Sequence, residues 1–121
     1  MPTDWSDNIL LADLADEPEL AEEFSAVVER LKNAPTDKLP HVVLNFGGVS
    51  YVNSSHIAAL LRMRKRVQEG RKQLVLAALT DEVWSIILLT GLDKVFQFAP
   101  DTMTALARVQ LADSAGGGTE A

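Results

Sequence analysis

Apolar residues along the chain follow two kinds of spacing, one typical of buried strands and one of amphipathic helices. Short, nearly continuous apolar runs predict strands at 9–14, 41–46, 74–79 and 95–98. Apolar residues that recur every three or four positions, with capping residues before them or Gly after them, predict helices at 18–32, 54–69, 82–90 and 101–109. Because strands and helices alternate, the pattern favours an α/β fold with helices packed on a small, mixed but mostly parallel, four-stranded sheet.

The length of 121 residues is suited to one domain with one core. We expect an N-terminal tail at 1–8, a folded domain at 9–112 and a disordered, Gly-rich tail at 113–121. The first residues show no basic region followed by an apolar run, and no apolar run is long enough to cross a bilayer. We therefore expect a cytoplasmic protein without membrane insertion.

Charge and composition exclude several classes of partner and cofactor. The net charge of −6 argues against nucleic acid as a partner. There is no cysteine, no pair of histidines at metal-ligand spacing and no Gly-rich phosphate loop, so we expect neither a metal nor a cofactor. Six of the 11 basic residues lie between Arg62 and Lys72. This cluster is either a solvated helix face or a surface that steers an acidic partner, with Arg62 as a candidate contact.

Only one group of residues suggests catalysis. Ser54, Ser55 and His56 are adjacent in the sequence. A hydrolytic enzyme would need a serine nucleophile and a histidine base that are close together in space. Neighbouring residues on a helix point in different directions, so adjacency argues against a working Ser–His pair. We expect no catalytic residue and no enzymatic activity.

The segment from Val42 to Phe98 carries a family resemblance. It begins with a buried strand, the turn Gly47-Gly48 and a loop that ends in Asn53-Ser54-Ser55. An amphipathic helix, a second buried strand and a Thr-Gly-Leu sequence before Val95-Phe96 follow in this order. This order resembles the STAS domain of bacterial anti-sigma factor antagonists. The resemblance covers about residues 9–110, and because it is poor before Leu20, the first strand of the family is expected to be short or missing.

The resemblance implies a partner switch that regulates transcription. In this family, the unphosphorylated antagonist binds an anti-sigma factor that is also a serine kinase, phosphorylation of a loop serine breaks the complex, and a protein phosphatase restores it. By position the phosphorylated residue is Ser54, with Ser55 as a lesser candidate. A phosphate at a helix N-terminus is tolerated by the helix dipole and the free backbone amides, so the switch would act on binding and leave the fold intact.

Two motif positions depart from the family. Asn53 stands where Asp is usual, and His56 stands where Gly is usual and would fill the space that a partner backbone needs. Both changes affect kinase recognition, and residues 53–55 could equally be a helix cap and nothing more. Two alternatives therefore stay open: a STAS scaffold without phosphorylation, such as a subunit of a stressosome-like or lipid-transport complex, and a nucleotide- or lipid-binding STAS domain.

The predicted helix at 82–90 suggests a second contact surface. Trp84 and Leu88 are four residues apart, on a different face from the apolar positions Val83 and Ile87. An exposed Trp–Leu pair would mark an interaction surface, and one possible partner for it is a second copy of the chain in a homodimer. The alternative is that the helix is more deeply buried and that Trp84 lies on its neighbours. The predicted partner-binding residues are Asn53, Ser54, Ser55, His56, Arg62, Trp84 and Leu88.

Overall fold

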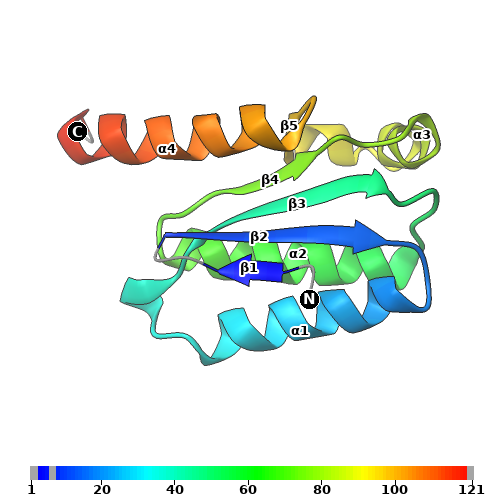
Figure 1. Cartoon of the computed structure of the whole chain (residues 1–121), viewed down its shortest axis with the longest axis horizontal. Helices are drawn as coiled ribbons and strands as arrows, with labels where there is room; N and C mark the ends of the chain where they lie inside the picture. Colours follow the sequence, from blue (N-terminus) through cyan, green and yellow to red (C-terminus); the bar gives the residue numbers. More distant parts are fainter. Residues whose placement is uncertain (1–2, 6–7, 120–121) are drawn as a thin grey trace.

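The computed structural model (Figure 1) describes the backbone of residues 3–5 and 8–119 and the side chains of residues 8–112. Its centre is a sheet with the strand order β1-β2-β3-β4-β5. The strands are β1 (Thr3–Trp5), β2 (Ile9–Ala15), β3 (His41–Gly48), β4 (Leu74–Ala77) and β5 (Gln97–Ala99). Strands β2 to β5 run parallel, which confirms the predicted mostly parallel α/β sheet.

The fifth strand, β1, corrects the predicted N-terminal tail. Residues 3–5 pair antiparallel with β2, so β2 is not an edge strand. Three residues are too few to show a periodic pattern, so only the pairing with β2 identifies this strand. Strand β2 itself spans seven residues, longer than the family resemblance suggested.

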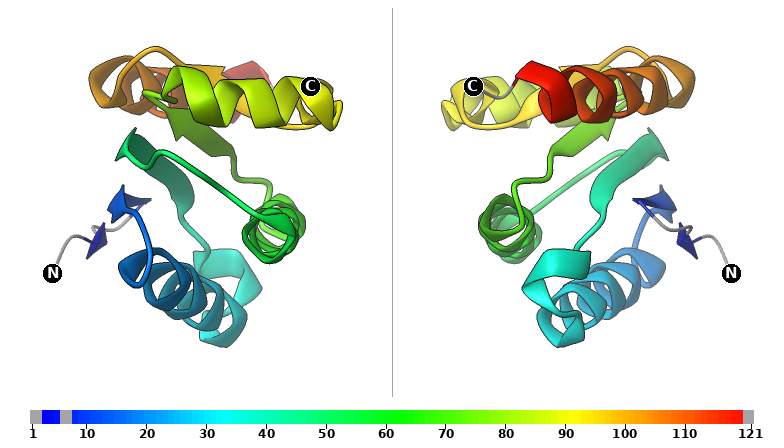
Figure 2. Two further views of the ribbon diagram at one scale, coloured as in Figure 1. Left: turned by 90° about the vertical axis from the view of Figure 1, so that its right-hand side faces the viewer. Right: turned by 90° about the vertical axis from the view of Figure 1, so that its left-hand side faces the viewer.

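In the described part of the chain, four α-helices pack around the sheet. Helices α1 (Glu19–Asn33) and α2 (Ser54–Glu69) lie side by side on one face, and α4 (Thr102–Thr119) lies on the other (Figure 2). Helix α3 (Asp81–Leu89) contributes Val83 and Ile87 to the core that α1 and α2 share. The smaller core under α4 contains Val43, Val75 and Val109.

The alternation of side chains along the strands explains both cores. Leu10, Ala12 and Leu14 of β2 face α1 and α2 and are buried, whereas Ile9 and Leu11 pack on the α4 side. Strands β3 and β4 are covered on both faces, so residues 42–44 and Leu74–Ala77 are both apolar and buried. This is why the sequence shows continuous apolar runs there.

Several boundaries differ from those predicted. Gly91, at φ 75°, follows α3 and leads into a 3-10 helix at Leu92–Lys94, so β5 begins two residues later than expected, at Gln97. Helix α4 continues to Thr119, into the segment predicted to be a disordered tail. The side chains of that segment, from residue 113 on, lie outside the described residues.

The parallel arrangement brings the carboxyl ends of β2 and β3 together. Gly48, the last residue of β3, pairs with Ala15 across a shift in register after Asp13. A Cβ atom at Gly48 would lie 2.9 Å from the carbonyl oxygen of Leu14, so only glycine allows the two strands to approach this closely. The loops that leave these two ends are therefore neighbours, although they are more than thirty residues apart in sequence.

Candidate functional site

Helix α2 begins at Ser54, and its first turn is closed by a reciprocal cap. The side-chain oxygen of Asn53 accepts hydrogen bonds from the backbone N–H groups of Ser55 and His56, at 2.9 and 3.1 Å. The Nδ1 atom of His56 accepts a hydrogen bond from the backbone N–H of Asn53, at 3.0 Å. This is a capping box in which His takes the place of the usual Glu or Gln. Asn53 and His56, the two residues that depart from the family motif, therefore form one reciprocal cap of α2.

The imidazole of His56 lies beneath the loop. It is only 3% exposed, and its centroid is 5.8 Å from that of the Phe24 ring, which it meets edge-on. Because Nδ1 accepts a hydrogen bond, Nε2 carries the proton and donates it to the carboxylate of Glu17. The expectation that this side chain fills the space needed by a partner is wrong, since burial turns it inward.

Two acidic residues after β2 fasten the loop from the other side. The carboxylate of Asp16 accepts hydrogen bonds from the backbone N–H and the hydroxyl of Ser50, both at 2.8 Å, and these bonds hold the pKa of Asp16 below its usual value. The hydrogen bond from His56, assisted by one from the backbone of Ala21, lowers the pKa of Glu17. Both carboxylates thus favour the ionised form that holds the loop.

Asp16, Glu17 and Ser50 were not among the site residues that we expected from the sequence. The sequence did contain a signal for the two acids, because they come just after the predicted strand 9–14. The carboxyl end of this strand lies beside the carboxyl end of the next strand, β3. Nothing in the sequence pairs Asp16 with Ser50, because 34 positions separate them and only the parallel sheet brings them together.

The two candidate phosphorylation sites have different surroundings. Ser54 and Ser55 are both exposed, but Ser55 lines a hollow between α1 and α2 together with Arg62. The amides of Ser55 and His56 already donate to Asn53, so they are not free to bind a phosphate on Ser54, contrary to our expectation. The helix dipole still stabilises such a phosphate.

The structure gives no support to a catalytic Ser–His pair. Both ring nitrogens of His56 are engaged, one with the Asn53 amide and the other with Glu17, so the imidazole has no free nitrogen for a serine proton. Among residues whose placement is described, no group of three or more acidic or histidine side chains could hold a metal ion. Within the same residues, no helix is both long and apolar enough to cross a membrane.

The predicted contact surface on α3 is only partly exposed. Trp84 is half-buried and meets the Phe98 ring edge-on, with a centroid distance of 4.9 Å, so the expected exposed Trp–Leu pair is wrong for Trp84. Leu88 is 49% exposed and its neighbour Leu89 is 86% exposed. The hollow of about 370 Å³ beside Trp84 is lined by Leu79, Asp81, Trp84 and residues 98–100 and by none from 53–56. The structure therefore does not place Trp84 and Ser54 at one site.

The model of the STAS domain family matches residues 13–105. An anti-sigma-factor antagonist (STAS) domain protein from Planctomyces limnophilus has a similar structure, with a TM-score of 0.74 and 18% identity over 89% of this chain and 96% of that one. A putative anti-sigma factor antagonist from Thermotoga maritima matches with a TM-score of 0.73 and 15% identity over 90% and 93% of the two chains. At these identities the structural likeness establishes the fold.

Proposed function

Because this chain belongs to the STAS domain family, we propose that it acts as a partner-switching module of the anti-sigma factor antagonist type. It binds a serine-kinase-type anti-sigma factor through residues 53–56 and the first turns of α2. Phosphorylation of Ser54 by that kinase releases it, and a protein phosphatase returns it to the binding form. The module acts by binding and carries out no reaction of its own.

The observation that supports this proposal is the exposed hydroxyl of Ser54 on a rigidly held loop. Ser54 is the first residue of α2, and the contacts of Asp16 and Glu17 fix the backbone before and after it. A fixed surface costs little conformational entropy when a partner binds.

The same geometry gives a reason for release. A phosphate adds nearly two negative charges. The amides of Ser55 and His56 already bond to Asn53, so these two donors would not compensate the phosphate where it faces the partner. Burying such a charge in an interface costs several kcal/mol. The domain itself stays folded because Ser54 is exposed.

Affinity purification from the host of this protein tests the proposal. Tagged wild type, Ser54→Ala and Ser54→Asp are compared, with Ser55→Asp as the matched control on the neighbouring residue. We expect wild type, Ser54→Ala and Ser55→Asp to recover a protein with a serine-kinase domain, and Ser54→Asp to lose it. Mass spectrometry of the wild type should find phosphate on Ser54. Recovery of no kinase-type protein by any variant would contradict the proposal.

A fixed docking surface is a second candidate function, and the reciprocal cap favours it. Asn53 and His56 replace the usual Asp and Gly of the family motif with a built hydrogen-bond network that includes Glu17. This network suits a STAS scaffold that holds its partner constitutively. In that case all variants would recover the same partners, and Ser54 would carry no phosphate in cells.

A further inference from the structure

A groove runs between α1 and α2, from the Ser54 loop towards the far ends of both helices. It consists of two hollows of about 470 and 450 Å³, which share Val28 and Arg62 in their walls. Along α2 the groove extends from Ser55 to Glu69, about 20 Å at 1.5 Å per residue. That length matches about six residues of extended chain.

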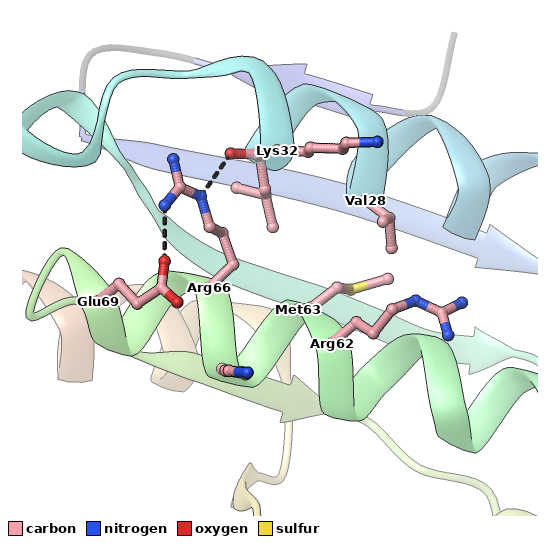
Figure 3. A pocket seen from close by; sticks show the side chains of 8 residues that line it. Val28, Lys32, Arg62, Met63, Arg66 and Glu69 are labelled. Carbon is pink, nitrogen blue, oxygen red and sulfur yellow. Dashed lines mark hydrogen bonds and ion pairs between the residues drawn. The ribbon is translucent and has the colours of Figure 1, made fainter.

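The half of the groove that is distant from Ser54 is apolar at its base and basic along its sides (Figure 3). Val28, Leu31 and Met63 supply the apolar base. The charged residues that line this half are Lys32, Arg62, Lys65, Arg66 and Glu69. Four cations therefore surround a single carboxylate, in a chain whose net charge is −6.

Among these cations, Arg66 is engaged in holding the fold. Arg66 donates to the carbonyl oxygens of Leu31 and Ala34, at 2.9 and 2.7 Å, and pairs with Glu69 at 2.6 Å. Over the part of the chain with described side chains, Lys32, Arg62 and Lys65 have no ion pair. The groove thus presents three uncompensated positive charges beside an apolar base.

We propose that this groove binds an acidic segment of a partner protein that carries at least one large apolar side chain. The apolar side chain packs on Val28, Leu31 and Met63, and carboxylates of the segment pair with Lys32, Arg62 and Lys65. The inference rests on the proposed function, because it names the chemistry of the partner for a surface that begins at the Ser54 loop.

The charges in the other half of the groove give the segment a direction. Glu17 and Glu29 line the hollow near Ser55, so carboxylates of the segment are disfavoured there and favoured beside Lys32 and Lys65. The acidic part of the segment therefore lies away from Ser54. A partner that covers Ser54 can extend this part along the groove.

Selection of random peptides on phage tests the inference without a known partner. Wild-type protein is the target, and the enriched peptides are synthesised and their dissociation constants measured. The test variant is Lys32→Glu/Arg62→Glu/Lys65→Glu. The control variant, Arg64→Glu/Arg71→Glu/Lys94→Glu, makes the same charge change outside the basic half of the groove. Circular dichroism confirms that each variant folds, and Arg62→Glu alone replaces the triple variant if that one does not.

We expect enriched peptides to combine several Asp or Glu residues with Leu or Phe. They should bind wild type and the control variant alike and bind the test variant about ten-fold more weakly or worse, since several charge pairs become repulsions. Binding should also weaken as salt rises from about 50 to about 500 mM, because screening shortens the range of these charges.

Three results would overturn the inference: no enrichment, enriched peptides without acidic residues, or acidic peptides that bind the test variant equally well. Sedimentation with phosphatidylglycerol vesicles tests the alternative that these cations bind an anionic membrane surface. Vesicle binding that the test variant loses, without peptide enrichment, would assign the cations to a membrane. Peptide binding that Ser54→Asp retains, with no kinase-type partner recovered from the host, would refute the proposed function and leave the groove established.

Discussion

Replacing His56 by alanine removes the side chain that joins the cap of α2 to the segment after β2. The backbone N–H of Asn53 loses its acceptor, which costs about 1 kcal/mol. The edge-on contact with Phe24 is worth about 1 kcal/mol, and the cavity left by a ring that is 3% exposed adds about 1–2 kcal/mol. We expect the free energy of unfolding to fall by about 3–4 kcal/mol, a substantial part of the 5–15 kcal/mol that is typical of proteins.

Urea denaturation at neutral pH, followed by circular dichroism, measures this loss. Ser55→Ala is the control, because this neighbouring side chain is exposed and should change stability by no more than about 0.5 kcal/mol. His56→Gln should recover part of the loss, since Gln at this position of a capping box can also accept from the Asn53 N–H. A loss below about 1 kcal/mol for His56→Ala would refute the reasoning, because neither the cap nor the packing would then depend on the imidazole.

A double-mutant cycle isolates the contact with Glu17. Glu17→Gln should destabilise the wild type, and the same change should have a smaller effect in the His56→Ala background, because the carboxylate has then already lost His56 and keeps only the backbone N–H of Ala21. An equal effect of Glu17→Gln in both backgrounds would show that the two side chains act independently.

Three further predictions concern other residues of the fold. Hydrogen bonds lower the pKa of Asp16 and of Glu17 from their ordinary values of 3.8 and 4.5, so their stabilisation is present at neutral pH and is lost as the pH falls below these values towards the lowered pKa values of the fold. Acid titration of the melting temperature should show a shallower loss for Glu17→Gln than for the wild type. Burial raises the pKa of Glu23, so its charge opposes folding at neutral pH, and Glu23→Gln should raise the melting temperature there but not at a pH below the ordinary value of 4.5. Gly48→Ala should cost about 2–3 kcal/mol in urea denaturation, because the new methyl group would meet the Leu14 backbone oxygen at 2.9 Å; a cost no greater than that of Gly47→Ala would contradict this.

The main elements of this fold follow from local sequence patterns. Apolar runs identify β2, β3 and β4, and the three- and four-residue spacings identify α1, α2 and α3, because side-chain periodicity reflects which faces are buried. Capping residues identify the start of α2, with Asn53 as its N-cap. The parallel sheet follows from the alternation of the elements, and the position of Ser54 at a helix N-terminus follows from the cap.

Pairings between distant segments were not predictable from the sequence, because its periodicity records which face of an element is buried but not which residue lies opposite. Strand β1 has too few residues for a pattern, and Trp84 packs on Phe98 where its spacing suggested an exposed position. His56 turned inward because Glu17, 39 positions earlier, offers a carboxylate beside Phe24. The sequence by itself determined the α/β fold and the place of Ser54. The tertiary structure decided how its loop is held, because the parallel pairing of β2 with β3 brings Asp16 and Glu17 beside it. It also decided which cations border the groove, because α1 lies against α2.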